Sequence, residues 1–231
     1  MTRDTRWHGS PNFGDRRGGL TPELVVVHYT AMDSCDAALD RLCDPNAEVS
    51  SHYLISEKGD VLQLVEEDKR AWHAGGGRWR GRGDVNSRSI GIELDNTGQT
   101  PFSEPLMSAL EDVLCGVLAR WSIPAHAVIG HSDMAPDRKF DPGCRFDWQR
   151  LARQGLSIWP DATPSTTDFA TSATRFGYDL EHGEQAVLHA FRQRFRPMAT
   201  RQFFAPESPP DATDRALAAD LADRFGIDAT D

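Results

Sequence analysis

The sequence predicts an α/β fold with a mixed central β-sheet flanked by helices, followed by a small all-α C-terminal domain. Three observations predict it: a buried-strand pattern, a β-hairpin pattern, and apolar residues that recur with helical spacing between the strands and near the carboxyl end. Strands that alternate with helices are typical of α/β domains. The 231 residues suffice for one large domain or for one domain with a small companion.

Five segments carry the strand patterns. Residues 24–29 begin with a continuous apolar run rich in valine, which is typical of a strand buried on both faces. Residues 51–56 and 61–65 flank a turn that contains glycine, and together they predict a β-hairpin. Two further strands are expected at 89–94 and 127–129, which completes the predicted sheet.

Two helices are predicted among these strands. Ser103 can cap the longer helix, Pro105 lies in its first turn, and apolar residues continue with helical spacing to Trp121. The shorter helix carries Cys35 and Cys43, which a rise of about 1.5 Å per residue would separate by about 12 Å. Because that separation exceeds the reach of a disulfide, we expect free thiols.

The composition changes after the predicted α/β domain of residues 1–159. Residues 160–173 are rich in Thr, Ser and Pro, which predicts a linker. The predicted C-terminal domain, residues 174–231, contains two apolar helical stripes, one ended by Pro197 and one by Gly226. A helical unit of this size is marginal alone, so we expect it to dock on the first domain.

Charge and hydropathy exclude several classes of function. The formal net charge is −10, whereas a general nucleic-acid binder needs a basic face. No window approaches 18 uncharged apolar residues, so we expect no transmembrane segment. Residues 1–8 lack the apolar core of an export signal, which favours a cytoplasmic location for a chain that begins here.

Two histidines and one aspartate have the pattern of a catalytic metal site. His28 lies at the end of the first buried strand, His131 directly follows an apolar segment, and Asp141 precedes a Pro-Gly turn. Two imidazoles and a carboxylate would fill three of the four positions that Zn²⁺ prefers and leave one for water. Because His28 and His131 are far apart in the sequence, the fold must bring them together. Taken alone, His28 is better explained as an ordinary histidine at a strand end.

Five short motifs occur in one order along residues 28–143. They are His28-Tyr-Thr-Ala, Val49-Ser-Ser-His52-Tyr, Ala71-Trp-His73-Ala-Gly75, Asn86 through Ser89-Ile-Gly-Ile-Glu93, and Gly130-His131 through Lys139-Phe-Asp141-Pro-Gly143. In these motifs the chain resembles the AmpD-like zinc N-acetylmuramoyl-L-alanine amidases, or amidase type 2 family, which share their fold with peptidoglycan recognition proteins. The tail, through Gly177-Tyr-Asp179 and the segment ended by Pro197, resembles the helical peptidoglycan-binding domain of some members.

The resemblance implies that His28, His131 and Asp141 bind one Zn²⁺ together with a water molecule. It also implies that Glu93 and Lys139 form the catalytic pair. The expected reaction is hydrolysis of the amide between the lactyl group of N-acetylmuramic acid, or its 1,6-anhydro form, and L-alanine, in cell-wall turnover or recycling. A carboxylate can move the proton of the attacking water, and a cation can stabilise the oxyanion. The expected partners are muropeptides and other peptidoglycan fragments.

The expected substrate-binding residues are Trp72, His73, Asn86, Arg80 and Arg82. His73 would hydrogen-bond a muropeptide while Trp72 packs on its sugar or peptide, and the alternative for His73 is a structured loop anchor. The two arginines lie in an arginine-rich loop, where guanidinium groups would bind carboxylates of the stem peptide. The alternative for this loop is a solvated basic segment.

Two further residues are expected near the site without being ligands. His52 begins a predicted strand and is interpreted as a core group or a group that supports the site. The recognition-protein and phage branches use a cysteine as the third ligand, but here Asp141 takes that place, and Cys144 is expected to be only a nearby thiol. Two functions stay open as alternatives: a non-catalytic peptidoglycan-binding protein, and a zinc hydrolase of other amides.

Overall fold

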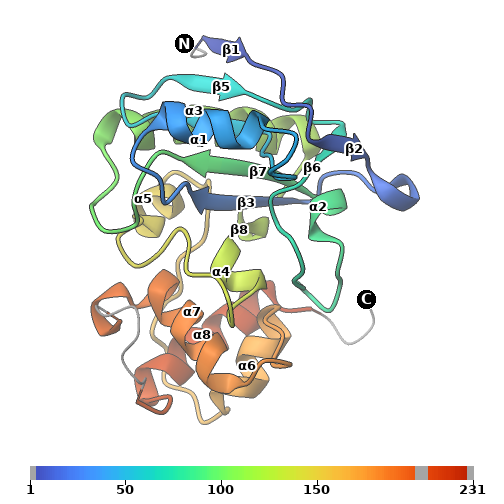
Figure 1. Ribbon diagram of the computed structural model, residues 1–231. Helices are drawn as coiled ribbons and strands as arrows, with labels where there is room; N and C mark the ends of the chain where they lie inside the picture. The colour runs from blue at the N-terminus through green and yellow to red at the C-terminus, as the bar shows by residue number, and fades with distance from the viewer. Residues whose placement is uncertain (1–3, 201–207, 228–231) are drawn as a thin grey trace.

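The computed structural model describes residues 4–200 and 208–227 and contains one six-stranded sheet with helices around it (Figure 1). The sheet has the order β1-β5-β4-β7-β3-β8, in which only β4 and β5 are antiparallel neighbours. Its strands are β1 (Thr5–Trp7), β3 (Leu24–Tyr29), β4 (Tyr53–Ile55), β5 (Val61–Gln63), β7 (Ser89–Leu94) and β8 (Val128–Gly130). The predicted mixed α/β sheet is therefore confirmed.

A separate two-stranded antiparallel ribbon pairs β2 (Phe13–Asp15) with β6 (Lys69–Ala71). The predicted hairpin is the β4–β5 pair, and its turn contains Gly59 at a φ of +85°, a left-handed conformation that favours glycine. The ladder covers only Tyr53–Ile55 and Val61–Gln63, and beyond it the N–H of Leu64 donates to the His52 carbonyl while the N–H of His52 donates to the Gly91 carbonyl of β7. The hairpin strands are therefore shorter than the segments that the alternation predicts.

Helices α1 (Cys35–Cys43) and α3 (Glu104–Trp121) cover opposite faces of the sheet (Figure 1). On β4, Leu54 packs in the cluster under α1, whereas Tyr53 and Ile55 belong to the cluster that contains α3. Alternate strand residues point to opposite faces, which explains this division. Ser103 caps α3, since its Oγ accepts a hydrogen bond from the backbone N–H of Leu106, as predicted.

The remaining short helices lie in the connections. The α-helices are α2 (Val85–Arg88), α4 (His131–Met134) and α5 (Trp148–Arg153), and the 3₁₀ turns are η1 (Arg17–Gly19), η2 (Ala125–Ala127) and η3 (Pro197–Ala199). The four cysteines are free thiols, and α1 spans the segment between Cys35 and Cys43, as the helical spacing predicts. Within the described residues no helix is both long and apolar enough to cross a membrane.

The carboxyl-terminal part of the chain forms a helical layer beyond β8 and α4 (Figure 1). Its helices are α6 (Phe169–Phe176), α7 (Glu184–Phe195) and α8 (Ala212–Phe225). Their buried aromatic residues join the same apolar core as the sheet, for example where Trp79 packs edge-to-face on Phe176 and Tyr178. The helical layer is therefore continuous with the α/β part.

Two expectations for this region need correction. Residues 169–173 lie in α6, whose first turn is capped by Asp168, so the predicted linker of 160–173 extends too far. The apolar spacing of the stripe that Pro197 ends predicts that Leu180 belongs to it, but the helix that carries this stripe, α7, begins only at Glu184. Residues 1–3, 201–207 and 228–231 of the predicted domains lie outside the described residues. The assignment of 174–231 as a peptidoglycan-binding-like domain stays a prediction.

Candidate metal centre and active site

Three parallel strands bring the candidate site residues to one edge of the sheet. His28 is the fifth residue of β3 and is directly opposite Glu93 of β7 in the register. His131 is the first residue after β8, the other parallel neighbour of β3. Because carboxyl ends of parallel strands meet at the same edge, residues far apart in the sequence become neighbours there.

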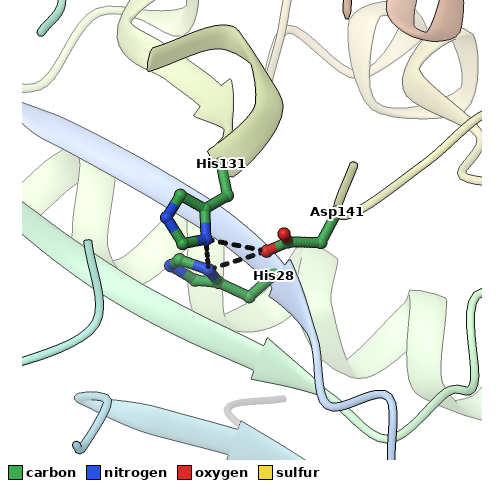
Figure 2. Close-up of side chains that lie close together, drawn as sticks. All are labelled: His28, His131 and Asp141. Carbon is green, nitrogen blue, oxygen red and sulfur yellow. Dashed lines mark hydrogen bonds and ion pairs between the residues drawn. The ribbon is translucent and has the colours of Figure 1, made fainter. Parts of the chain in front are cut away.

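Asp141 joins the two histidines from the loop that follows α4 (Figure 2). Its approach depends on Gly130, because a Cβ at that position would lie 2.7 Å from the Cδ of Pro142. The backbone N–H of Ser132 also donates to the Asp141 carbonyl at 2.9 Å. A side chain at position 130 would therefore push the Asp141 loop away from the start of α4.

Three ligand atoms converge on one point (Figure 2). The Nδ1 atoms of His28 and His131 lie 2.9 Å apart, and they lie 2.9 Å and 3.0 Å from Oδ2 of Asp141. Because the pKa of Asp141 is held well below its ordinary value, its carboxylate is ionised, and protons on the two histidines alone cannot satisfy all three contacts. If both Nδ1 atoms carry a proton, both N–H groups can donate to the carboxylate, but the two N–H groups then repel each other. If only one Nδ1 or neither carries a proton, a nitrogen lone pair faces another acceptor. A cation removes this conflict, and the donor set suits Zn²⁺.

The partners of the other ring nitrogens direct both Nδ1 lone pairs to this point. His131 Nε2 donates to the Ala74 carbonyl at 3.1 Å, so its Nδ1 carries no proton. Ser89 donates its hydroxyl to the Val85 carbonyl at 2.6 Å and therefore accepts from His73 Nε2 at 3.1 Å. His73 Nδ1 is then an acceptor for the Nε2–H of His28, 3.0 Å away.

The loop that carries His73 is itself fixed by two features. Oδ1 of Asn86 accepts hydrogen bonds from the backbone N–H groups of His73 and Ala74, at 3.0 and 2.8 Å. The His73 ring lies against Gly91 of β7, where an added Cβ would come within 2.4 Å of the ring. The sheet therefore has the room that this histidine needs only because residue 91 is glycine.

The charges of the metal-free site favour cation binding. Burial, together with the proximity of His131, lowers the pKa of His28 to about 4, so its imidazole is neutral at pH 7. Burial acts to raise the pKa of Asp141, but the two histidines outweigh it and hold that pKa well below its ordinary value. A neutral imidazole and an ionised carboxylate are the forms that bind a metal.

Glu93 and Lys139 face the same pocket as the ligands. Burial, and secondarily the charge of Asp141, raises the pKa of Glu93 to about 8, while Lys139 acts in the opposite direction. Oε2 of Glu93 is buried and has no hydrogen-bond partner within the described residues. A carboxyl group in this state is suited to exchanging a proton with a bound molecule.

The pocket has a volume of about 380 Å³ and opens beside the metal ligands. Trp72 and His73, both expected to bind substrate, line it. Sequence reasoning missed several other lining residues. These are Tyr29, Thr30, Ala31, Met32, Ala38, Arg41, Leu42, Val49, Ser50, Arg138 and Phe140. For Arg138 a signal existed, because it directly precedes Lys139.

Three of the expected substrate-binding residues do not reach this pocket. The guanidinium of Arg80 donates to the backbone carbonyls of Phe176 and Phe225, and that of Arg82 donates to Glu23. Asn86 is buried behind the loop that it holds. Substrate binding by these three residues stays a prediction, and in this structure their polar groups pair within the fold.

The structure also shows where His52 and Cys144, both expected near the site, lie. His52 is buried in the core, where its Nδ1 accepts from the N–H of Gly91 at 2.9 Å and its ring lies 5.9 Å from that of His73. Burial lowers the pKa of His52 to about 3. Cys144 is a half-buried free thiol outside the three-residue ligand cluster.

Comparison with known proteins agrees with this geometry. Residues 18–144 match the family model described as N-acetylmuramoyl-L-alanine amidase. The chain is 36% identical to N-acetylmuramoyl-L-alanine amidase AmiD of Escherichia coli K12, over 89% of this chain and 84% of that protein. It is 37% identical to 1,6-anhydro-N-acetylmuramyl-L-alanine amidase AmpD of the same strain, over 62% of this chain and 87% of that protein.

A solved structure extends the likeness to the helical layer. It is the complex of AmiD from E. coli with the substrate anhydro-N-acetylmuramic acid-L-Ala-D-gamma-Glu-L-Lys, and it superimposes with a TM-score of 0.79 at 34% identity. The match covers 94% of this chain and 99% of that one, so it includes α6, α7 and α8 as well as the sheet.

Proposed function

The chain belongs to the N-acetylmuramoyl-L-alanine amidase family, and from this premise we propose that it hydrolyses the amide between the lactyl group of N-acetylmuramic acid, or its 1,6-anhydro form, and L-alanine. The observation that carries the proposal is the convergence of His28, His131 and Asp141 in a pocket that also contains Glu93 and Lys139. A protein that only binds peptidoglycan does not need this combination.

The three ligand residues would hold Zn²⁺ through Nδ1 of each histidine and Oδ2 of Asp141. Zinc bound there would lower the pKa of a water molecule towards about 7 and polarise the scissile carbonyl. The protein orients its ligands through the carbonyl of Ala74 and the relay from His73 to Ser89. These partners fix the tautomers and are part of the proposed site.

Glu93 would act as the general base and then as the general acid. In its ionised form it takes a proton from the attacking water, and as the carboxylic acid it returns that proton to the nitrogen of the leaving L-alanine. Oε2 is buried and has no partner in the part of the chain that the structure describes, which leaves this oxygen available for the exchange. A pKa raised by burial favours the return of the proton.

Lys139 would stabilise the negative charge that develops on the carbonyl oxygen. Lys139 lines the same pocket as the metal ligands, which supports this role. Loss of a single donor of this kind costs other enzymes about 10²–10³ in kcat. We therefore assign proton transfer to Glu93 and stabilisation of the negative charge to Lys139. Trp72 and His73 would line the pocket beside the bound muropeptide.

The test is product analysis by mass spectrometry. The protein is incubated with an N-acetylmuramoyl tripeptide and with its 1,6-anhydro form, each with and without a zinc chelator. We expect release of a free peptide that begins with L-alanine, its loss on chelation and its recovery on adding zinc. Binding of either compound without cleavage, by protein shown to contain zinc, would instead favour the non-catalytic alternative.

Cleavage of simple N-acyl amino acids at a comparable kcat/KM would favour the broader alternative, a zinc hydrolase of other amides. A preference of at least about tenfold for muramoyl peptides would oppose it. The cytoplasmic location expected from the sequence is a separate proposal, and fractionation of cells that express the full gene product would test it.

A further inference from the structure

Directly behind the metal ligands lies a second buried polar cluster, which contains Asp133, Arg194 and Tyr178. Asp133 is on α4, two residues after His131, whereas Arg194 is on α7 and Tyr178 precedes α7. All three are almost fully buried. The cluster therefore joins the helical layer to the short helix that begins with a metal ligand.

Each contact in this cluster pairs a donor with an acceptor. Arg194 donates through Nη1 to Oδ2 of Asp133 at 2.7 Å and through Nη2 to the carbonyl of Val128 at 2.8 Å. Tyr178 donates its hydroxyl to Oδ1 of Asp133 at 2.5 Å. The guanidinium also lies over the ring of Trp148, 4.5 Å from its centroid. Because the guanidinium group is planar and donates to two acceptors, its orientation is fixed.

The cluster is connected by hydrogen bonds to both segments that supply metal ligands besides β3, namely α4 and the Asp141 loop. Oδ2 of Asp133 also accepts from the N–H of Gly130 at 2.8 Å, which closes the turn around His131. One residue after His131, the N–H of Ser132 donates to the carbonyl of Asp141. A shift of α4 would therefore move the His131 ring and the Asp141 loop together.

We propose that Arg194 and Tyr178 are positioning residues that hold α4, and through it His131 and Asp141, in the geometry that binds the metal. The helical layer is then part of the catalytic unit. This proposal deepens the proposed function, on which its mechanistic meaning rests, but it concerns buried residues outside the pocket lining.

Arg192 provides a matched control on the same helix. It is equally buried and forms an ion pair with Asp214 of α8, so it stabilises the helical layer. The other partners that the structure describes for it are Ser208 and Pro209, which lie outside α4. Asp214 also pairs with Arg196 and keeps a cationic partner when Arg192 is replaced. Comparing Arg194→Lys with Arg192→Lys therefore separates positioning of the site from stability of the layer.

The experiment measures zinc affinity by competition with a chromophoric chelator, on the full chain and well below the melting temperature. We expect Arg194→Lys to weaken zinc binding by about 3- to 10-fold, somewhat less than the change of about 10- to 100-fold seen for groups that contact a ligand directly. Arg192→Lys should stay within about twofold of wild type although both variants melt earlier. Equal zinc affinity in the two variants would overturn the proposal.

A second readout needs no metal. In metal-free protein, hydrogen exchange of the Ser132 amide should be faster in Arg194→Lys and unchanged in Arg192→Lys. Should Arg194→Lys fail to fold, Tyr178→Phe carries the same two measurements, because it removes one hydroxyl and keeps the ring. Failure of the proposed function would appear differently, as normal zinc binding without cleavage of any muropeptide.

Discussion

Two buried polar clusters lie on either side of α4, and they differ in how their contacts are satisfied. In the cluster of Asp133, Arg194 and Tyr178, each contact joins a donor to an acceptor. In the cluster of His28, His131 and Asp141, no placement of protons on the histidines satisfies all three contacts while Asp141 is ionised. In the first arrangement every contact is a hydrogen bond, and only Nε of Arg194 has no partner among the described residues. In the second, the contacts themselves conflict, and a cation resolves the conflict.

This difference separates residues that stabilise the fold from residues that bind a ligand. Buried polar groups are normally paired, so a buried set that cannot be paired within the protein marks a place where something else binds. The two clusters are only two residues apart on α4. The cluster of Asp133, Arg194 and Tyr178 therefore holds the same short helix that carries the metal ligand His131.

The largest effect is expected from Asp141→Asn, which removes the only negative charge of the unpaired cluster and keeps its shape. An amide is a poor zinc ligand, so we expect loss of bound zinc and a fall in kcat/KM of at least about 10³. Zinc content by mass spectrometry and steady-state kinetics measure the two effects. Full activity with zinc still bound would show that Asp141 is not a ligand.

Next in size is Glu93→Gln, which keeps the ligands and removes the proposed base. We expect kcat to fall by about 10²–10⁴ while the zinc content is unchanged. The combination matters, because it distinguishes a catalytic group from a ligand. A variant that loses its zinc, or one that keeps its kcat, would contradict the assignment.

The same substitution should stabilise the metal-free protein at high pH. Burial raises the pKa of Glu93 from its ordinary 4.5 to about 8, so the folded state holds this proton more tightly than the unfolded state. The stability from protonated Glu93 is full below pH 4.5 and is lost as the pH rises towards 8. In urea unfolding without metal, Glu93→Gln should gain on the order of a few kcal/mol over wild type between pH 4.5 and 8.5. A difference in the free energy of unfolding that does not change over this pH range would contradict the prediction.

A smaller effect is expected in the relay that orients His28. His73→Phe keeps an aromatic ring against Gly91 but leaves the Nε2–H of His28 without its acceptor. Zinc affinity should fall by about 10- to 100-fold, and by less in Ser89→Ala, which lies one hydrogen bond further away. The chelator competition described above measures both. Unchanged affinity in His73→Phe would show that the relay does not control the tautomer.

The smallest effect is expected at Arg82. Its guanidinium forms an exposed ion pair with Glu23 outside the pocket, and such pairs contribute about 0–1 kcal/mol. Arg82→Ala should therefore leave KM for a muramoyl tripeptide within about twofold of wild type. A severalfold rise in KM would restore the interpretation that this arginine binds the stem peptide.

The sequence allowed prediction of the sheet and of the residues that meet at its edge. The run of residues 24–29 and the pattern of residues 89–94 became β3 and β7 with the expected bounds. His28, Glu93 and His131 could be predicted to meet because each lies at the carboxyl end of a strand, which is a property of local pattern and parallel topology.

The supporting contacts could not be predicted, because their partners are distant in the sequence. Arg194 lies in the segment Phe191-Arg-Gln-Arg-Phe195, where only the two phenylalanines belong to the apolar stripe. The structure buries the polar residues between them as well. Arg192 pairs with Asp214 of α8 and Arg194 with Asp133 of α4, whereas the buried amide of Gln193 has no hydrogen-bond partner among the described residues. Similarly, the loop containing Arg80 and Arg82 gave a charge pattern but no sign that both side chains would find partners inside the fold.

The most direct test of the account is a crystal structure of the zinc-loaded protein with anomalous data collected at the zinc edge. The account predicts one zinc per chain, bound by Nδ1 of His28, Nδ1 of His131 and Oδ2 of Asp141, with Asp133 still paired to Arg194 and Tyr178. Zinc bound elsewhere, or bound through Nε2 of either histidine, would contradict the claim that the unpaired cluster is the metal site.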